Sequence, residues 1–337
     1  MKRYILKIAT QNASVNLPYY VTGRGRPLFM VIGFHSTVKR FMPLIEYLSD
    51  YFTIYVPELP GNSTPEPLPM EHTAINYAKI FNKLLMHLKL KNCLLAGFSL
   101  GAIIAIRMLE LQASSEFKTG PATSSPPISA PHSPPDSGSE MRANWGSPTR
   151  VTRFSKFKEI QHLLPTHVML VAGIYDTDLF RIPLRFRFAI EIIKRVNPNN
   201  PIIYNMAYYC LHSRRFLRWF LTMVYRQEPD FEKVVEHQIE LTLNMDTRAW
   251  LELAHDIFNL HFSCENLRFN IPATLVNNLS DDILDGKKTT EGFLKMFPKG
   301  KNFNLTLPRH SPKGPIDIKF VSRLLTPLVP HLKKLAS

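Results

Sequence analysis

A serine in a glycine-flanked turn is the first residue of this sequence that could do chemistry. Ser99 lies within Gly97-Phe98-Ser99-Leu100-Gly101, after the apolar run Cys93-Leu94-Leu95-Ala96 and before an apolar stretch over residues 102–109. The pattern predicts a strand, a tight turn and a helix, which would lift Ser99 above a sheet beside the positive end of that helix. The alternative is an ordinary packed turn that holds an unreactive serine.

A base and an acid are needed next, because a serine hydroxyl is a poor nucleophile at neutral pH. His310 follows a predicted strand over residues 302–307, and imidazole is the side chain best suited to shuttle a proton. An ordinary loop histidine is the alternative. A carboxylate must then fix the tautomer of the imidazole. We assign this role to Asp282, which follows a predicted strand over 273–277. Three rivals stay open: Asp281, Asp285 and Asp176.

The elements that would position these residues alternate between strand and helix, which predicts a parallel sheet covered on both faces. An opening hairpin is expected over residues 4–9 and 17–22. Further strands are expected over 28–32, 52–56, 92–96, 168–172, 273–277 and 302–307. Helices are expected over 41–51, 73–88, 100–112, 289–296 and 316–335, the last interrupted near Pro327 and Pro330.

Changes in composition divide the chain into five parts. The expected core covers residues 1–112, 156–176 and 269–337. Residues 113–155 are rich in proline and serine and nearly free of large aliphatic side chains, which predicts a disordered insert. Residues 177–268 are helical and rich in aromatic side chains, which predicts a cap over Ser99. The aromatic content favours an apolar pocket for an acyl chain or an aromatic ester, although the same side chains could simply form the core of the cap.

The overall composition limits the classes of partner and cofactor. The 337 residues are 45% hydrophobic and carry a net charge of +14, yet no nucleic-acid motif accompanies the charge, so we expect no nucleic-acid partner. Three scattered cysteines are too few for a disulfide framework or a zinc site and fit a reducing, cytoplasmic compartment. There is no dinucleotide fingerprint and no phosphate-binding loop. We therefore expect no metal and no organic cofactor, and a small ester-like molecule as the substrate.

A membrane contact is a further expectation. The sequence shows neither a signal peptide nor an uninterrupted transmembrane helix, because Arg214, Arg215 and Arg218 fall within the apolar segment 201–225. Phe216, Trp219 and Phe220 adjoin these arginines and suggest a basic aromatic surface that meets anionic lipid from outside. The alternative is that the basic first half of the cap pairs with its acidic second half. The oligomeric state is left open.

Four stretches resemble the α/β-hydrolase fold family over most of the chain. Residues 97–101 resemble its nucleophile elbow, 31–34 its oxyanion loop, 56–63 the loop after its fourth strand, and 272–282 its penultimate strand and acid. Ser99, Asp282 and His310 meet the family order of nucleophile, acid and histidine. The resemblance implies an α/β fold with a mostly parallel sheet, flanking helices and an inserted helical cap. It also implies an oxyanion hole formed by the backbone N–H groups of Phe34 and Leu100.

The expected activity is therefore that of a serine esterase, lipase-like, acting through an acyl-enzyme on Ser99. The same triad would serve a thioesterase, an acyltransferase or a carbon–carbon bond hydrolase. A catalytically silent binding or scaffold protein is another alternative, because the chain departs from the family pattern. The departures are Ile32 and Asn62 for residues that are commonly His or Gly, Glu58 for Asp, and Leu279 and Arg309 for Gly.

Overall fold

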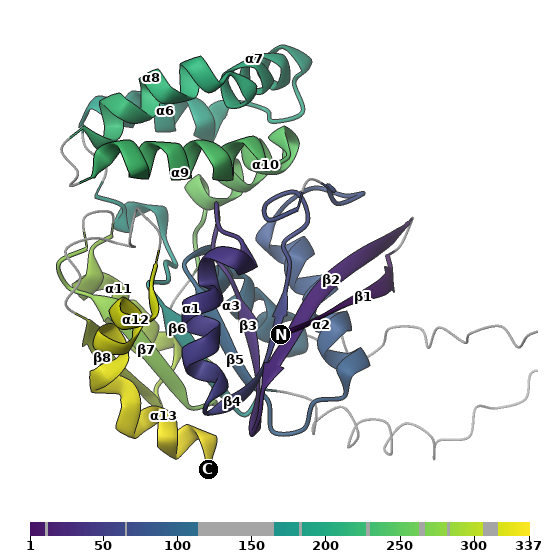
Figure 1. The fold of residues 1–337 in the computed structure, drawn as a ribbon, viewed down its shortest axis with the longest axis vertical. Coiled ribbons are helices and arrows are strands. Elements are labelled where there is room, and N and C mark those ends of the chain that lie inside the picture. The colour runs from purple at the N-terminus through teal and green to yellow at the C-terminus, as the bar shows by residue number, and fades with distance from the viewer. Residues whose placement is uncertain are drawn as a thin grey trace, which may run out of the picture.

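An eight-stranded sheet forms the centre of the computed structural model (Figure 1). The structure describes residues 1–10, 13–64, 66–113, 165–181, 184–226, 230–262, 267–281, 284–305 and 316–337. The strands lie in the order β1-β2-β4-β3-β5-β6-β7-β8. Their bounds are β1 Lys2–Ala9, β2 Ser14–Gly23, β3 Arg26–Val31, β4 Phe52–Pro57, β5 Leu94–Phe98, β6 His167–Val171, β7 Ala273–Asn278 and β8 Gly300–Leu305. β2 is antiparallel to both of its neighbours and the other pairs are parallel, so β3 to β8 end at the same edge.

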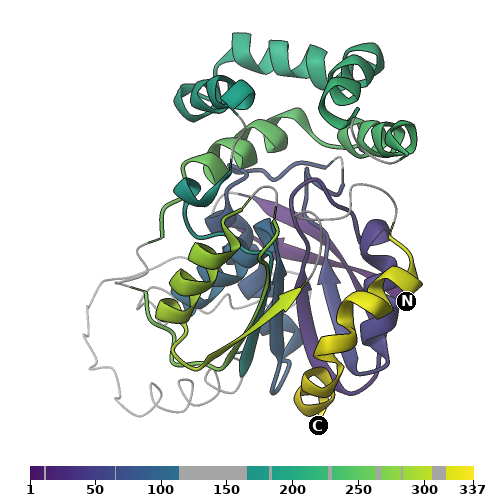
Figure 2. The same ribbon diagram turned by 90° about the vertical axis from the view of Figure 1, so that its left-hand side faces the viewer.

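Helices cover both faces of this sheet, as the alternation in the sequence predicts. Figure 2 shows α1, α12 and α13 on one face and α2, α3 and α11 on the other. Their bounds are α1 Val38–Ser49, α2 Ala74–Leu88, α3 Leu100–Ala113, α11 Gly286–Met296, α12 Ile318–Leu325 and α13 Val329–Ala336. Because the middle strands are covered twice, their side chains are almost wholly buried, as in Leu94, Leu95 and Ala96 of β5.

Five helices between β6 and β7 stand over the sheet edge where the parallel strands end (Figure 1). They are α6 Leu184–Arg195, α7 Pro201–His212, α8 Arg214–Tyr225, α9 Phe231–Leu243 and α10 Thr247–Phe258. The 3₁₀ turn Thr177–Leu179 precedes them. The predicted fold class, a mostly parallel sheet with flanking helices and a helical insertion, is confirmed. No helix of the described ranges is long and apolar enough to cross a bilayer.

The element ends differ from the expectation where a cap or a proline decides them. α1 begins at Val38 rather than near Phe41, because the Thr37 side chain accepts a hydrogen bond from the Arg40 N–H. The expected C-terminal helix is divided into α12 and α13 by the 3₁₀ turn Thr326–Leu328, which contains Pro327. The expected 113–155 insert lies outside the described residues, apart from Ala113 at the end of α3.

Candidate active site

Ser99 occupies a strained turn between β5 and α3. Its φ angle is +53°, in the left-handed region that non-glycine residues adopt at a cost of about 1–3 kcal/mol. The Ser99 N–H donates to the Val171 carbonyl oxygen of β6 at 2.9 Å, which fixes the turn to the neighbouring strand. A Cβ on Gly97 or Gly101 would lie 2.4 Å or 2.1 Å from a backbone carbonyl oxygen, so only glycine fits at either position. The half-buried Ser99 side chain thus sits beside the N-terminus of α3.

The loop after β3 runs directly against this turn. A Cβ built on Gly33 would lie 3.3 Å from the Ser99 Cβ and 3.0 Å from the Phe98 carbonyl oxygen. Phe34 follows Gly33, and Leu100 is the first residue of α3, where backbone N–H groups have no partner within their own helix. The two residues predicted to form the oxyanion hole therefore flank Ser99, one along the chain and one across the sheet edge. Their role as donors stays a prediction.

Asn62 holds the loop after β3 in place from the loop after β4. Its side chain is buried, and its Oδ1 accepts a hydrogen bond from the His35 N–H at 2.8 Å. Its Nδ2 donates to the carbonyl oxygens of Gly33 and Ser36, each at 3.3 Å. The Phe34 peptide is therefore bracketed on both sides by bonds to one side chain. Sequence reasoning noted Asn62 only as a departure from the family pattern, because a contact across 27 residues leaves no local signal.

His35 connects the same loop to the insertion. Its Nε2 lies 2.8 Å from the Thr242 hydroxyl of α9, which itself donates to the Gln238 carbonyl oxygen. The hydroxyl must therefore accept from His35, which fixes the Nε2–H tautomer. Burial lowers the pKa of His35 to about 4, so the ring is neutral at pH 7. As a neutral donor to Thr242, His35 has a structural role that connects the loop after β3 to α9.

The predicted acid and base lie outside the described residues. Asp282 and His310 belong to the undescribed stretches 282–283 and 306–315, so the triad stays a prediction. The described ends of β7 at Asn278 and β8 at Leu305 are adjacent in the sheet, on the side of β6 away from β5. The segments that carry both residues therefore start from the same sheet edge as Ser99.

The rival carboxylates already have partners in the structure. Asp285 caps α11 by accepting from the Lys288 N–H at 3.1 Å, and this bond holds its pKa below the ordinary value. Asp176 accepts from the Asp178 N–H at 2.8 Å and lies 3.1 Å from the exposed His261. Asp281 is buried and accepts from the Leu284 N–H at 2.9 Å. Each of these bonds stabilises a local turn, and the choice of Asp282 over these three carboxylates stays a prediction.

Aromatic side chains from the core and the insertion meet beside the turn. The Phe34 ring lies 6.4 Å from that of Trp250 on α10, and Phe98 packs edge-on against Phe41 at 5.3 Å. Both Phe34 and Trp250 are half-buried. The loop after β3 and the elbow thus carry aromatic side chains, and Trp250 of the insertion packs against the first of them through Phe34.

α10 is fixed to the core through carboxylates. Glu252, which is buried, accepts from the His72 N–H at 2.6 Å and from Arg248 Nε at 2.7 Å. Asp256 accepts from the Ala74 N–H at 2.7 Å, at the start of α2. The Asp246 N–H donates to the Gly61 carbonyl oxygen at 2.8 Å, directly beside Asn62. The helix that supplies Trp250 is therefore bonded to the loop that positions Gly33 and Phe34.

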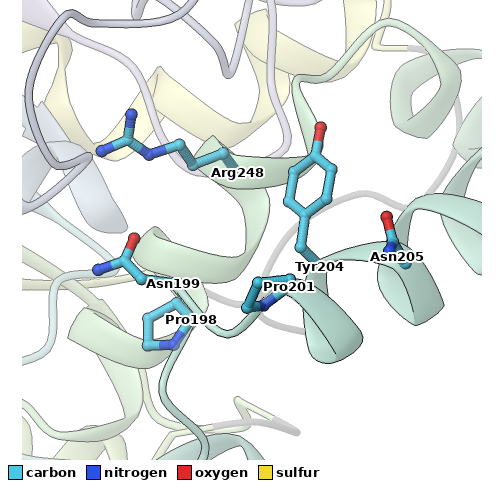
Figure 3. A pocket seen from close by; sticks show the side chains of 6 residues that line it. All are labelled: Pro198, Asn199, Pro201, Tyr204, Asn205 and Arg248. Carbon is cyan, nitrogen blue, oxygen red and sulfur yellow. The ribbon is translucent and has the colours of Figure 1, made fainter.

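A cavity of about 450 Å³ lies within the insertion and is separate from the elbow. Figure 3 shows its lining, which comes from the segment before α7, from α7 and from α10. The lining residues are Pro198, Asn199, Pro201, Tyr204, Asn205 and Arg248. None of them belongs to the loops around Ser99. Within the described ranges, no group of three or more His, Cys, Asp or Glu side chains is arranged to hold a metal ion.

Comparisons with known proteins concern the fold. No protein-family model matches the chain, and no curated protein matches its sequence. A thermophilic esterase from Thermogutta terrifontis is similar in structure, with 15% identity, a TM-score of 0.63 and 100% of both chains covered. An N-acyl homoserine lactonase complexed with N-butanoyl homoserine has 12% identity and a TM-score of 0.60 over 98% of this chain and 97% of its own. A bromoperoxidase from Bacillus anthracis has 15% identity and a TM-score of 0.59 over 99% and 100%.

These three structures are similar to this chain over 98–100% of its length, at 12–15% sequence identity. The chain therefore has the α/β-hydrolase fold, as the sequence predicted.

Proposed function

We propose that the chain is a serine hydrolase that cleaves an ester-like bond through an acyl-enzyme on Ser99. The observation that carries the proposal is the Ser99 turn, with φ at +53° and Gly33 packed against its Cβ. Strain of this kind persists only where the surrounding structure enforces it, and it is concentrated at functional sites. The similarity of the fold to an esterase and a lactonase supports the same class of reaction.

In the proposed reaction, Ser99 Oγ attacks the substrate carbonyl carbon while His310 accepts the serine proton. The negative charge on the tetrahedral oxygen is stabilised by the backbone N–H groups of Phe34 and Leu100. His310 then donates the proton to the leaving oxygen, and the acyl-enzyme forms. Water attacks the acyl carbon with His310 as base, which releases the acid and restores Ser99. Asp282 holds the imidazole ring in the required tautomer.

An apolar acyl or aromatic group is the substrate portion that the surroundings of Ser99 favour. Phe98 lies in the elbow, Phe34 in the loop after β3, Phe41 on α1 and Trp250 on α10. Polar headgroups would lose hydrogen bonds to water there without replacement, whereas an acyl chain would lose none. We therefore expect medium-length acyl chains to be preferred over acetyl groups.

A series of p-nitrophenyl esters of increasing acyl length tests this proposal. We expect turnover that rises with chain length, and a loss of roughly 10³-fold or more in Ser99→Ala. Ser49→Ala is the matched control, because Ser49 lies on α1 and donates only to the Glu46 carbonyl oxygen. Full activity in Ser99→Ala would refute the mechanism. A folded wild-type protein that turns over no ester of the series would instead favour a silent binding protein.

A further inference from the structure

The outermost helices of the insertion expose an unusual amount of apolar surface. Half of the large hydrophobic side chains that are exposed in the described ranges lie on α7 and α8. Six of them, which we call the outer cap patch, are Ile202, Met206 and Tyr209 on α7, and Trp219, Phe220 and Met223 on α8. Tyr209 is 75% exposed, Ile202 70% and Trp219 61%. Spacings of three, four and seven residues place them along one stripe of each helix.

Five of these six side chains expose more than half of their surface, and Phe220 is the exception. α8 buries a different stripe, in which Leu217 packs with Val235 and Ile239 of α9. Leu221 and Tyr225 join that small core. α8 is therefore apolar on two sides, and only one of them faces a neighbouring helix. A second apolar stripe on a surface helix indicates an interaction site.

The position of the patch leaves it accessible. α7 and α8 form the layer of the insertion farthest from the sheet, with α9 and α10 between them and the core (Figure 1). Ser213 alone separates the two helices, and it caps the end of one and the start of the next. The two helices that carry the stripes are therefore consecutive in the chain and adjacent in the outer layer.

The charge of α7 and α8 indicates which kind of partner surface the outer cap patch would bind. The segment 201–226 contains four arginines and no aspartate or glutamate. Arg214 and Arg218 form ion pairs with Glu236 and Glu240 on α9, so these two are neutralised within the insertion. Arg215 is exposed, belongs to no ion pair within the described ranges, and lies one helical turn from Trp219.

We propose that the outer cap patch is a docking surface for an anionic phospholipid bilayer. Its apolar side chains enter the headgroup region, Trp219 lies at the interface that tryptophan prefers, and Arg215 contacts lipid phosphates. A protein partner would equally bury apolar side chains. The exposed apolar side chains lie beside Arg215, in a segment without aspartate or glutamate, and this charge is complementary to an anionic membrane. The proposal does not depend on the activity of Ser99.

Vesicle flotation with the full chain tests the proposal. The vesicles are phosphatidylcholine alone or phosphatidylcholine with about one third phosphatidylglycerol. We expect binding to the anionic vesicles at least about tenfold stronger than to the neutral ones, and weakened by salt. Two variants should each weaken binding to anionic vesicles about tenfold or more. One is the triple variant Ile202→Ser/Tyr209→Ser/Trp219→Ser, and the other is Arg215→Glu. Brominated lipid should quench the fluorescence of wild-type protein more than that of Trp219→Phe.

The matched control is Ile318→Ser/Arg323→Glu on α12, which makes the same changes at exposed positions outside the insertion. It should bind vesicles like wild type, as should Ser99→Ala. The proposal would be overturned if Arg215→Glu and the triple variant both bound anionic vesicles as strongly as the wild-type protein. The same conclusion would follow from a dimer in lipid-free solution that the triple variant converts to monomer, since the patch would then join two copies of the chain. Binding to neutral vesicles equal to that on anionic ones would also overturn it.

Discussion

Asn62 is the residue whose contribution to the site is clearest from its bonds. Its amide both accepts and donates, so the peptide between Gly33 and His35 is held from two directions. Catalysis by oxyanion stabilisation depends on donors that are already oriented before charge develops. Asn62 touches no reacting atom in the proposed reaction, so it is a positioning residue for the Phe34 N–H.

We therefore expect Asn62→Ala to lower kcat by about tenfold to a hundredfold while KM changes little. Steady-state kinetics on the best ester of the series measures both constants. Asn76→Ala is the control, because Asn76 lies on α2 and its side-chain amide donates to the carbonyl oxygen of Glu71, away from Ser99. A purely structural role would lower the free energy of unfolding and leave kcat of the folded fraction intact. That result would contradict the assignment.

At the scale of elements, α10 connects the insertion to the loop that holds Asn62. Buried Glu252 carries two charge-assisted hydrogen bonds, one to the His72 N–H and one to Arg248. His72 itself is neutral, since burial lowers its pKa to about 4 and its Nε2 accepts from the Leu68 N–H. α10 is consequently part of the framework of the site, whereas α8 packs mainly on α9, and α7 packs on α8, α9 and α10.

Glu252→Ala should lower the free energy of unfolding by about 2 kcal/mol, because it leaves a buried N–H donor without a partner. Urea denaturation measures this change. The control is Glu240→Ala, which removes an exposed ion pair with Arg214 and should cost about 0–1 kcal/mol. Equal losses in the two variants would mean that α10 is not anchored through Glu252.

The positions of the helices and strands were largely predictable, because the sequence patterns that specify them are local. The apolar runs and glycines around Ser99 specify a strand, a turn and a helix within about twenty residues, and the structure places β5 and α3 there. The bonds from Asn62 to Gly33 and from Glu252 to His72 span 29 and 180 residues, so no periodicity or motif in the sequence predicts them. The sequence likewise could not separate the stripe of α8 that packs on α9 from the stripe that stays exposed, since both are apolar.

At the scale of the whole molecule, the fold provides one sheet edge where distant segments can meet. β5, β6, β7 and β8 are adjacent and parallel, so the last residues of these strands lie side by side at the edge beneath the insertion. Ser99 follows β5, and the undescribed stretches that contain Asp282 and His310 follow β7 and β8. Different helices of the insertion have different surroundings: α10 lies next to the candidate active site, and α7 and α8 carry the outer cap patch.

The central claim is that Ser99 is an activated nucleophile whose base is His310. Labelling of the intact protein with a fluorophosphonate probe, followed by peptide mapping, tests it most directly. We expect Ser99 to be the one labelled residue in the wild-type protein. Labelling should disappear in Ser99→Ala, and its rate should fall by roughly 10³-fold or more in His310→Ala. A folded wild-type protein that stays unlabelled, or a His310→Ala variant labelled at the wild-type rate, would contradict it.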